Sequence, residues 1–248
     1  MTVGPPLRLV VVGLSGRMGR EIATLAAADE TFAIVGGVGR SDLADLRSIA
    51  ATGDVLIDFS TPEATADVIA VARAARLPLV IGTTGLEAKT IEDLRDLSTA
   101  VPVWYARNMS TGVSLLQRIL PGVTRALAGF DIEVLEAHHR HKVDAPSGTA
   151  LMLAEAILAG LTGDAPQFVH GRAGYAPRNA GEIGFHAIRG GGNPGEHTVL
   201  FASDQEEVRI SHRAFTRQVF AAGAIRAARA IHGAAPGWYG PELVGADH

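Results

Sequence analysis

The feature that most restricts the fold of this chain is a short apolar segment that runs directly into a glycine-rich turn. Residues 7–12 are predominantly apolar and β-branched, the next residues read Gly13-Leu14-Ser15-Gly16-Arg17-Met18-Gly19, and residues 21–28 have a helical pattern. A strand, a glycine turn and a helix in this order present backbone N–H groups to the phosphates of a dinucleotide. Ser15 stands where the strict dinucleotide pattern has its second glycine, so an ordinary tight turn is the alternative for this segment taken alone.

Four further apolar segments of strand length follow, mostly alternating with helical patterns. They span residues 32–38, 55–59, 77–81 and 101–105. Thr61-Pro62 is typical of an N-cap followed by proline at the first helical position, which predicts a helix as far as Arg76. This alternation predicts a parallel, doubly wound α/β sheet.

Two more loops are expected at the same edge of that sheet as the glycine turn. Residues 82–85 follow the fourth strand and residues 106–109 follow the fifth. The carboxyl ends of parallel strands share one edge, where the nicotinamide ring of a dinucleotide would be held. A plain turn is the alternative for residues 82–85. The candidate cofactor-binding residues in these three loops are Gly13, Leu14, Ser15, Gly16, Arg17, Met18, Gly82, Thr83, Thr84, Ala106, Arg107, Asn108 and Met109.

The residues after the second strand bear on the choice of cofactor. A carboxylate at this place pairs with the ribose hydroxyl of NAD, but this chain has Gly39-Arg40-Ser41. A guanidinium and a hydroxyl suit a 2′-phosphate, so NADPH is favoured over NADH, with Arg40 as a further cofactor-binding candidate. Asp42 is close enough to keep NADH open, and a solvated surface position is the alternative for Arg40.

Residues 136–150 combine titratable side chains with the start of a helix. Residues 130–137 predict a buried strand, so the histidines that follow lie at its carboxyl end. Pro146 interrupts a regular strand, and Ser147 is a good N-cap for an apolar helix over residues 149–159 that Gly160 can close. The amides of Ser147, Gly148 and Thr149 are therefore expected to be unpaired and to bind a carboxylate.

His138 is the candidate proton-transfer group of this segment, and His139 and Lys142 add charge or donors beside the anion pocket. The expected substrate is a small, multiply anionic acid. A polar strand end without catalytic function is the alternative. A metal site is not favoured, because Arg140 and Lys142 lie among the potential ligands, which are Glu136, His138, His139, His141 and Asp144.

The second half predicts a different kind of sheet. Residues 183–188, 197–202 and 207–212 are expected to form antiparallel strands that join residues 130–137 in one mixed sheet. One helix layer leaves a second face to cover, which predicts oligomerisation. Residues 171–181 form a long polar loop that is mobile, reaches a neighbouring subunit, or does neither. A helix over residues 215–232 would return the chain to the first domain, giving domains of residues 1–109 with 217–248 and of residues 110–216.

Composition excludes several classes of protein. The 248 residues contain no cysteine, carry a net charge of −4 and are only 5% aromatic, which argues against a disulfide scaffold and against a nucleic-acid-binding protein. No apolar run has the length of a membrane span and the start lacks a secretory pattern, so a cytoplasmic location is expected, with no membrane or nucleic acid as partner.

These motifs together resemble one family, 4-hydroxy-tetrahydrodipicolinate reductase, also called dihydrodipicolinate reductase. The similarity covers essentially the whole chain: residues 136–150 are close to the family signature, and residues 13–19, 82–85, 106–109 and 195–197 match in the same order. The resemblance implies reduction of a cyclic imine dicarboxylate by NADH or NADPH in lysine and diaminopimelate biosynthesis. It also implies an α/β fold, with a Rossmann-like N-terminal parallel sheet and a C-terminal α+β domain that has a mixed sheet.

The family pattern also implies roles for single residues. His138 is the catalytic proton donor or acceptor, Lys142 is a second donor, and His139 contacts the substrate, whose carboxylate is bound by Gly148 and Thr149. The cofactor residues are those already named, Arg40 included, and the family is usually a homotetramer assembled through the mixed sheet.

Two features depart from the family pattern. Residues 41–54 form a much shorter segment than in many members, and Gly39 stands where many members have the acid that favours NAD. Two other functions share the predicted architecture. One is a binding protein that senses the redox state of the nucleotide without chemistry. The other is an oxidoreductase for a different small dicarboxylate.

Overall fold

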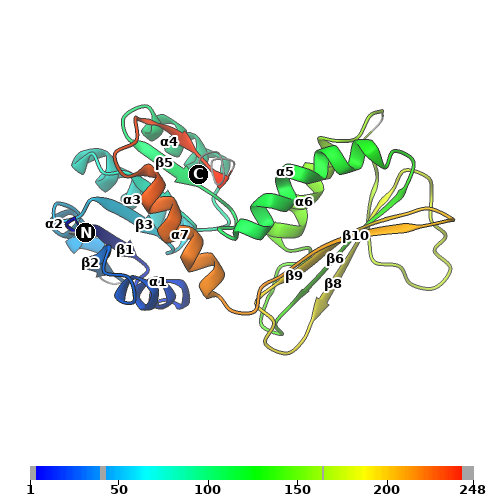
Figure 1. Ribbon diagram of the computed structural model, residues 1–248, viewed down its shortest axis with the longest axis horizontal. Coiled ribbons are helices and arrows are strands. Elements are labelled where there is room, and N and C mark those ends of the chain that lie inside the picture. Colours follow the sequence, from blue (N-terminus) through cyan, green and yellow to red (C-terminus); the bar gives the residue numbers. More distant parts are fainter. Residues whose placement is uncertain (1–3, 40–42, 164, 242–248) are drawn as a thin grey trace. The chain divides into compact units, whose positions relative to one another are not determined.

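The computed structural model describes residues 4–39, 43–163 and 165–241, and these form two compact units (Figure 1). The first unit comprises the described residues of Met1–Thr111 and Arg217–His248, and the second comprises those of Gly112–Thr216. Among the helices within these ranges, none has both the length and the apolar character that crossing a membrane requires.

The first unit is built on a parallel six-stranded sheet in the order β11-β5-β4-β3-β1-β2. Every strand of the predicted set is present, and the predicted Rossmann-like architecture is confirmed. The strand bounds are β1 Leu7–Val12, β2 Phe32–Val38, β3 Val55–Asp58, β4 Leu79–Ile81, β5 Pro102–Tyr105 and β11 Gly237–Tyr239. The short edge strand β11, which pairs with β5, is not anticipated by the sequence pattern.

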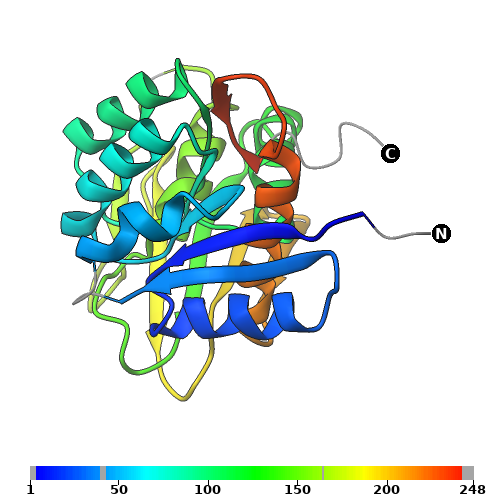
Figure 2. The ribbon, with the colours of Figure 1, turned by 90° about the vertical axis from the view of Figure 1, so that its left-hand side faces the viewer.

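Helices cover both faces of this sheet (Figure 2). Leu9 and Val11 of β1 pack in one core cluster with α1 (Arg17–Ala27) and α7 (Gln218–Ile231). Val10 and Val12 point the other way, into a second cluster. Burial on both faces explains why the strands read as continuous apolar runs. The second cluster also contains residues of α2 (Leu46–Ala50, preceded by the short η1, Leu43–Asp45), α3 (Pro62–Ala75) and α4 (Ala88–Ser98).

A glycine in α7 allows this helix to lie against the loop that follows β5. A Cβ atom at Gly223 would lie only 1.8 Å from the carbonyl oxygen of Met109. We expect Gly223→Ala to lower the free energy of unfolding by about 1–3 kcal/mol, because backbone on both sides must move to admit the methyl group. Urea denaturation measures this change.

Gly122→Ala is the matched control, because Gly122 is also helical and no atom lies within 4 Å of a Cβ placed there. This substitution is expected to leave stability unchanged or to raise it by up to about 1 kcal/mol. Equal stability of Gly223→Ala and the wild type would contradict the close approach of α7 to Met109.

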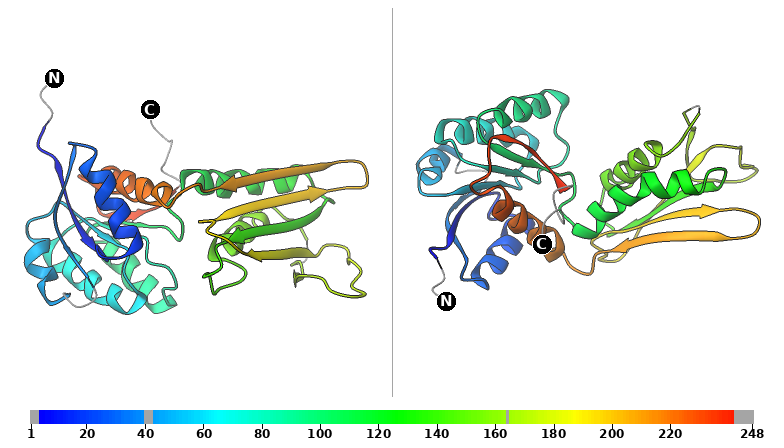
Figure 3. Two further views of the ribbon diagram at one scale, coloured as in Figure 1. Left: turned by 90° about the horizontal axis from the view of Figure 1, so that it is seen from below. Right: turned by 45° about the horizontal axis from the view of Figure 1, so that its top comes forward.

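The second unit has a mixed five-stranded sheet in the order β10-β9-β6-β8-β7, with α5 (Thr111–Ala126) and α6 (Gly148–Leu158) against one of its faces (Figure 3). Ile132 and Val134 point into the helix-covered core, and the alternate residues Glu133 and Leu135 belong to the other face. The strand bounds are β6 Asp131–His138, β7 Phe168–His170, β8 Ile183–Arg189, β9 Glu196–Ala202 and β10 Glu207–Arg213.

The prediction that residues 183–188 form an antiparallel strand is wrong. β8 runs parallel to β6, whereas β9 pairs with β6 antiparallel on the opposite side, so β8 and β9 are not neighbours. The chain leaves β6, passes through α6 and β7, and returns in the original direction, as a helical crossover requires. The glycine turn of residues 190–195 therefore carries the chain past the end of β6.

The structure also defines the end of α6 and the contacts of the loop of residues 171–181. Gly160 does not end α6 in a left-handed conformation, since the C-cap is Ala159 in a right-handed one. A Cβ at Gly160 would lie 2.4 Å from the carbonyl oxygen of Pro121, so this glycine serves the packing of α6 on α5. The loop of residues 171–181 is bound to its own sheet, because Arg178 donates to the carbonyl oxygen of Glu182 over 2.7 Å and pairs with Glu133.

Candidate active site

The glycine turn after β1 has the geometry that a phosphate-binding loop needs. Gly13 has φ +86°, and a Cβ on it would lie 2.4 Å from the carbonyl oxygen of Phe59. A Cβ on Gly19 would lie 2.3 Å from the carbonyl oxygen of Gly13. Helix α1 starts at Arg17 with Gly16 as its N-cap, so the amides of its first turn have no capping side chain from that residue.

The other two candidate loops follow β4 and β5, which adjoin β3 in the same sheet. Thr83 is buried, and its hydroxyl accepts a hydrogen bond from the Ser60 amide at 3.1 Å, so its side chain joins the loops after β3 and β4. Gly82 leaves room for the Phe59 ring, which would lie 2.2 Å from a Cβ there. Thr84 and Arg107 are exposed, whereas Ala106 and Met109 are buried. Arg40, the predicted 2′-phosphate contact, lies outside the described residues.

Asp58 at the end of β3 belongs to this region and is not among the predicted residues. It is fully buried, and its carboxylate accepts hydrogen bonds from the Ser60 amide at 2.9 Å and from the Thr65 hydroxyl at 3.0 Å. Burial raises the pKa of Asp58, although these hydrogen bonds oppose the rise. A single acid that closes an apolar strand is the only signal of this arrangement in the sequence.

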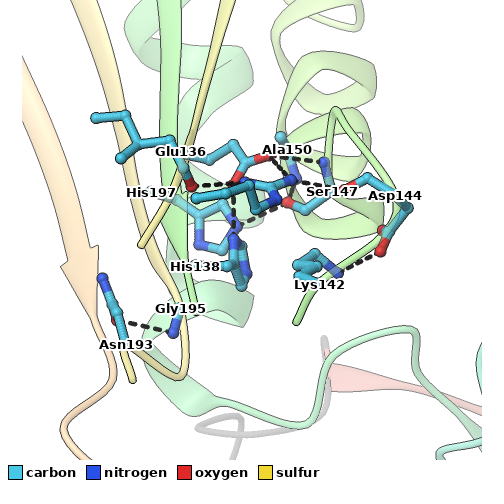
Figure 4. A network of polar contacts seen from close by, with 11 residues as sticks. Glu136, His138, Lys142, Asp144, Ser147, Ala150, Asn193, Gly195 and His197 are labelled. Carbon is cyan, nitrogen blue, oxygen red and sulfur yellow. Dashed lines mark hydrogen bonds and ion pairs between the residues drawn. The ribbon is translucent and has the colours of Figure 1, made fainter. Parts of the chain in front are cut away.

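In the second unit, residues 136–150 form one connected polar site (Figure 4). Glu136 and His138 point from β6 into the same side of the sheet, and both are buried. Nδ1 of His138 lies 2.6 Å from Oε2 of Glu136. Oε1 of Glu136 accepts a hydrogen bond from the amide of Ser147 at 3.1 Å, so one carboxylate joins the histidine to the start of α6.

Arg189, at the end of β8, donates further hydrogen bonds to the Glu136 carboxylate. Its two terminal nitrogens donate to the two carboxylate oxygens, each over 2.7 Å. Burial would raise the pKa of Glu136, but the hydrogen bonds from His138 and Arg189, with the positive charge of the guanidinium, outweigh it and lower this pKa to about 2. Glu136 is therefore ionised near neutral pH.

His197 of β9 is a second buried histidine of the site. Its ring meets that of His138 edge to face, with centroids 5.1 Å apart, and its Nε2 lies 3.0 Å from the Ser147 hydroxyl. Burial, reinforced by the neighbouring His138, lowers the pKa of His197 to about 3, so this imidazole is neutral near pH 7.

Ser147 is the N-cap that the sequence predicts, but the hydrogen bonding of the amides at this helix start differs from the prediction. It caps α6 as expected, since its hydroxyl accepts from the Ala150 amide at 3.1 Å. Its own amide, however, donates to Glu136, and the amide of Gly148 donates to Asp144, so the prediction of three unpaired amides is wrong at both residues. Only Gly148 and Thr149 of the predicted cradle lie inside the first turn of α6.

Lys142 and His139 lie on the turn between β6 and α6. Nζ of Lys142 is 2.8 Å from Oδ1 of Asp144, and the Lys142 amide donates to the His139 carbonyl over 3.1 Å. Burial would raise the pKa of Asp144, but Lys142 and the amide of Gly148 lower it. The predicted residues of this segment are thus brought to one place by β6, its turn and α6.

Arg189 and His197 are the site residues of the second unit that sequence reasoning missed. Arg189 is the last residue of β8 and His197 is the second residue of β9, and both strands pair with β6. The register sets Arg189 opposite His138 and His197 opposite Glu136. The motif Gly195-Glu196-His197 was a usable signal for the second residue. Within the described part of the chain, no three histidine and acidic side chains are grouped so as to hold a metal ion.

Comparison with known proteins identifies the family. Residues 7–109 match the model described as dihydrodipicolinate reductase, N-terminus, and residues 112–244 match dihydrodipicolinate reductase, C-terminus. The 4-hydroxy-tetrahydrodipicolinate reductase of Alkalilimnicola ehrlichii is 44% identical over 256 residues, covering 94% of this chain and 96% of that protein. The enzyme of the same name from Caldanaerobacter subterraneus subsp. tengcongensis is 39% identical over 241 residues, with the same shares covered.

Solved structures agree in fold. The dipicolinate-bound dihydrodipicolinate reductase of Paenisporosarcina sp. TG-14 superposes with a TM-score of 0.75 at 20% identity, covering 96% of this chain and 99% of that one. An engineered D-amino acid dehydrogenase bound to NADP+ gives a TM-score of 0.58 at 19% identity, with 98% and 97% covered. From the two family models and the near-full-length relatives it follows that this chain belongs to the dihydrodipicolinate reductase family.

Proposed function

We propose that this protein reduces 4-hydroxy-tetrahydrodipicolinate, a cyclic dicarboxylate, to tetrahydrodipicolinate with NADPH or NADH, as a step of lysine and diaminopimelate biosynthesis. Full-length relatives of that name support the reaction. The observation that carries it to this chain is the site of residues 136–150. There, one ionised glutamate joins a buried histidine to the N-terminus of a helix.

The loops of the first unit fit a dinucleotide. The space beside Gly13 and Gly19 admits no side chain, and the first turn of α1 offers amides and a positive dipole to phosphate. A bound nicotinamide dinucleotide supplies the hydride. We assign its binding to residues 13–18, 82–84 and 106–109, with the Thr83 side chain holding the loops together. We also assign it to Arg40, on which a preference for NADPH over NADH would depend.

The residues of the second unit bind the acid and move the proton. His138 transfers a proton to or from the substrate, Lys142 is a second donor, and His139 contacts the substrate. Gly148 and Thr149 hold a carboxylate at the start of α6, where the helix dipole favours negative charge. Lys142 and its partner Asp144 lie beside that helix start, so an incoming carboxylate competes with Asp144 for the ammonium group and for the Gly148 amide.

Lys142→Ala is expected to impair both substrate binding and turnover. The substitution removes a cation from the substrate cradle, which weakens attraction of a dianion, and it also removes a proton donor. We expect KM for the dicarboxylate to rise and kcat to fall, each by about 10-fold or more. Steady-state kinetics measure both. The matched control is Lys89→Ala, since Lys89 lies on α4 of the first unit and also pairs with an aspartate, Asp93. Unchanged KM and kcat in Lys142→Ala would contradict its role.

The proposed reaction is tested by steady-state reduction of the dicarboxylate with each cofactor in turn. Loss of the reduced nicotinamide absorbance on adding substrate is the expected result, with higher kcat/KM for NADPH. Tight cofactor binding without turnover of the dicarboxylate would overturn the enzymatic function and favour a redox-sensing protein. Faster turnover of another small dicarboxylate would overturn the choice of substrate.

We also propose that the protein is a cytoplasmic homotetramer assembled through the mixed sheet. Leu135 of β6 and Ile188 of β8 lie on the sheet face opposite to α5 and α6, and Ile188 is 59% exposed. Light scattering of the purified protein measures the mass, and a monomer at micromolar concentration would contradict the assembly.

A further inference from the structure

The strand β6 sets Glu136 and His138 two residues apart, on the side of the sheet that faces α5 and α6. The two residues are respectively 2% and 6% exposed, and their side chains meet over 2.6 Å between Oε2 and Nδ1. A contact of this length between buried polar groups orients the ring strongly. The two ring nitrogens of His138 therefore differ, because only Nδ1 contacts the carboxylate.

The ionisation of Glu136 decides which ring nitrogen of His138 carries the hydrogen. The two oxygens accept from both terminal nitrogens of Arg189 and from the amide of Ser147. A carboxylate with these donors is ionised and can only accept hydrogen bonds. Nδ1 of His138 must therefore be the donor in its contact with Glu136.

We propose that Glu136 and Arg189 are positioning residues for His138, holding its neutral imidazole with the hydrogen on Nδ1 and leaving Nε2 as the atom that exchanges a proton. The proposal rests on the proposed function for its kinetic consequences. Its structural part concerns the tautomer alone and does not depend on the identity of the substrate.

The surroundings of Nε2 agree with this assignment. A Cβ placed on Gly195 would lie 3.1 Å from Nε2 of His138, so the residue beside that nitrogen has no side chain to cover it. The Gly195 amide donates to Oδ1 of Asn193 over 3.0 Å, which holds this backbone in place. His197 approaches the same ring with its edge. The free nitrogen is thus bordered by backbone and by a neutral imidazole.

Arg189 has a second part in the arrangement. Its NH2 group also donates to the carbonyl oxygen of Asp144 over 2.6 Å, so it fixes the turn that carries Lys142. Its charge also balances that of the ionised Glu136 within this site. The charged and titratable groups on the elements around His138 include Glu136 on β6, Arg189 on β8, Glu196 and His197 on β9, His212 and Arg213 on β10, and His139, Arg140, His141, Lys142 and Asp144 on the turn before α6.

The direct test is the tautomer of His138 in the full-length protein, read from the ¹⁵N shifts of histidine-labelled samples and assigned with His138→Gln. We expect the neutral ring of the wild type to carry its hydrogen on Nδ1. In Glu136→Gln the amide oxygen should stay with Arg189 and Ser147, which turns an N–H toward Nδ1 and moves the ring hydrogen to Nε2. We expect kcat to fall by about 10²-fold or more, as when the wrong tautomer is imposed on a catalytic histidine.

Glu133→Gln is the matched control. Glu133 lies on the same strand but on the opposite face, and it also pairs with a histidine and an arginine, His186 at 2.7 Å and Arg178. We expect this variant to keep the His138 signals and the kcat of the wild type. A hydrogen on Nδ1 in Glu136→Gln, with kcat unchanged, would overturn the proposal.

Substitution of Arg189 is a second test, and it serves if Glu136→Gln does not fold. Arg189→Met removes the two donors that orient the Glu136 carboxylate, so the ring-nitrogen signals of His138 should move from their wild-type shifts, and Arg189→Lys should largely restore them. A purely structural role would lower stability without moving these signals, and unmoved signals in Arg189→Met would overturn the positioning role of Arg189. The spectra can be recorded without turnover. A wild-type protein that does not reduce the dicarboxylate would therefore refute the proposed function, whereas the tautomer of His138 alone decides the positioning proposal.

Discussion

Replacing His138 by glutamine is expected to lower kcat for reduction of the dicarboxylate by about 10²-fold or more, with little change in cofactor affinity. Glutamine can keep a hydrogen bond to Glu136, but it does not titrate and cannot supply a proton to the substrate. The dinucleotide loops belong to the first unit, whereas His138 belongs to the second. Steady-state kinetics give kcat, and fluorescence titration with NADPH gives the cofactor affinity.

His186→Gln is the control for this substitution. His186 also lies on the mixed sheet and pairs with a glutamate at 2.7 Å, but it is on β8 and on the face opposite to the site. This variant should retain wild-type turnover. Wild-type kcat in His138→Gln, in a protein with unchanged circular dichroism, would refute proton transfer by His138.

The first unit could be predicted almost element by element because its signals are local. β1 and β2 begin and end at the predicted residues, since an apolar run bounded by glycine or a polar turn defines a buried parallel strand without reference to its partner. The Thr61-Pro62 pair likewise marks the start of α3. The short strand β11 escaped prediction, because three residues carry no periodicity and depend on pairing with β5.

In the second unit, the sequence pattern predicts the strands but not the direction in which each strand runs. The pattern of residues 183–188 correctly predicts a strand, but a strand pattern has the same form whether the neighbouring strand runs parallel or antiparallel. The direction of β8 follows from the crossover through α6 and β7, which is a property of the whole chain path. For this reason the mixed sheet was predictable and the direction of β8 was not.

The candidate site divides in the same way. His138, Lys142 and the Ser147 cap lie close together in sequence, and their grouping could be predicted from one segment. Arg189 and His197 come from strands on either side of β6, so only the register of the sheet brings them to Glu136. The prediction of unpaired Ser147 and Gly148 amides failed because their acceptors, Glu136 and Asp144, enter the sequence analysis only as possible metal ligands. The NADPH preference stays a prediction, because Arg40 lies outside the described residues.

Acid should destabilise the second unit through His197. The folded protein holds the pKa of this imidazole at about 3, because it is buried and close to His138, whereas an unfolded histidine titrates near 6.5. Above pH 6.5 the ring is neutral in both states and favours neither. As the pH falls below 6.5, His197 becomes protonated in the unfolded chain but stays neutral in the folded protein. The free energy of unfolding therefore decreases until His197 of the folded protein also becomes protonated near pH 3. At about 1.4 kcal/mol per pKa unit, the loss between pH 7.5 and pH 5 is about 2 kcal/mol.

Urea denaturation at several pH values, at constant ionic strength, measures this loss. Glu136 does not obscure it, since the pKa of Glu136 is lowered from 4.5 to about 2 and its stabilising effect is lost only as the pH falls from about 4.5 toward 2. His212, whose pKa burial also lowers, acts in the same direction as His197, so some slope remains without His197. His197→Gln should reduce the slope between pH 7.5 and pH 5, even though lost packing lowers its stability at neutral pH. His170→Gln replaces an exposed histidine of the same sheet and is the matched control. A slope in His197→Gln as steep as that of the wild type would show that His197 takes up its proton at about the same pH in the folded and unfolded protein, which is incompatible with a neutral buried ring packed against His138 and the Ser147 hydroxyl.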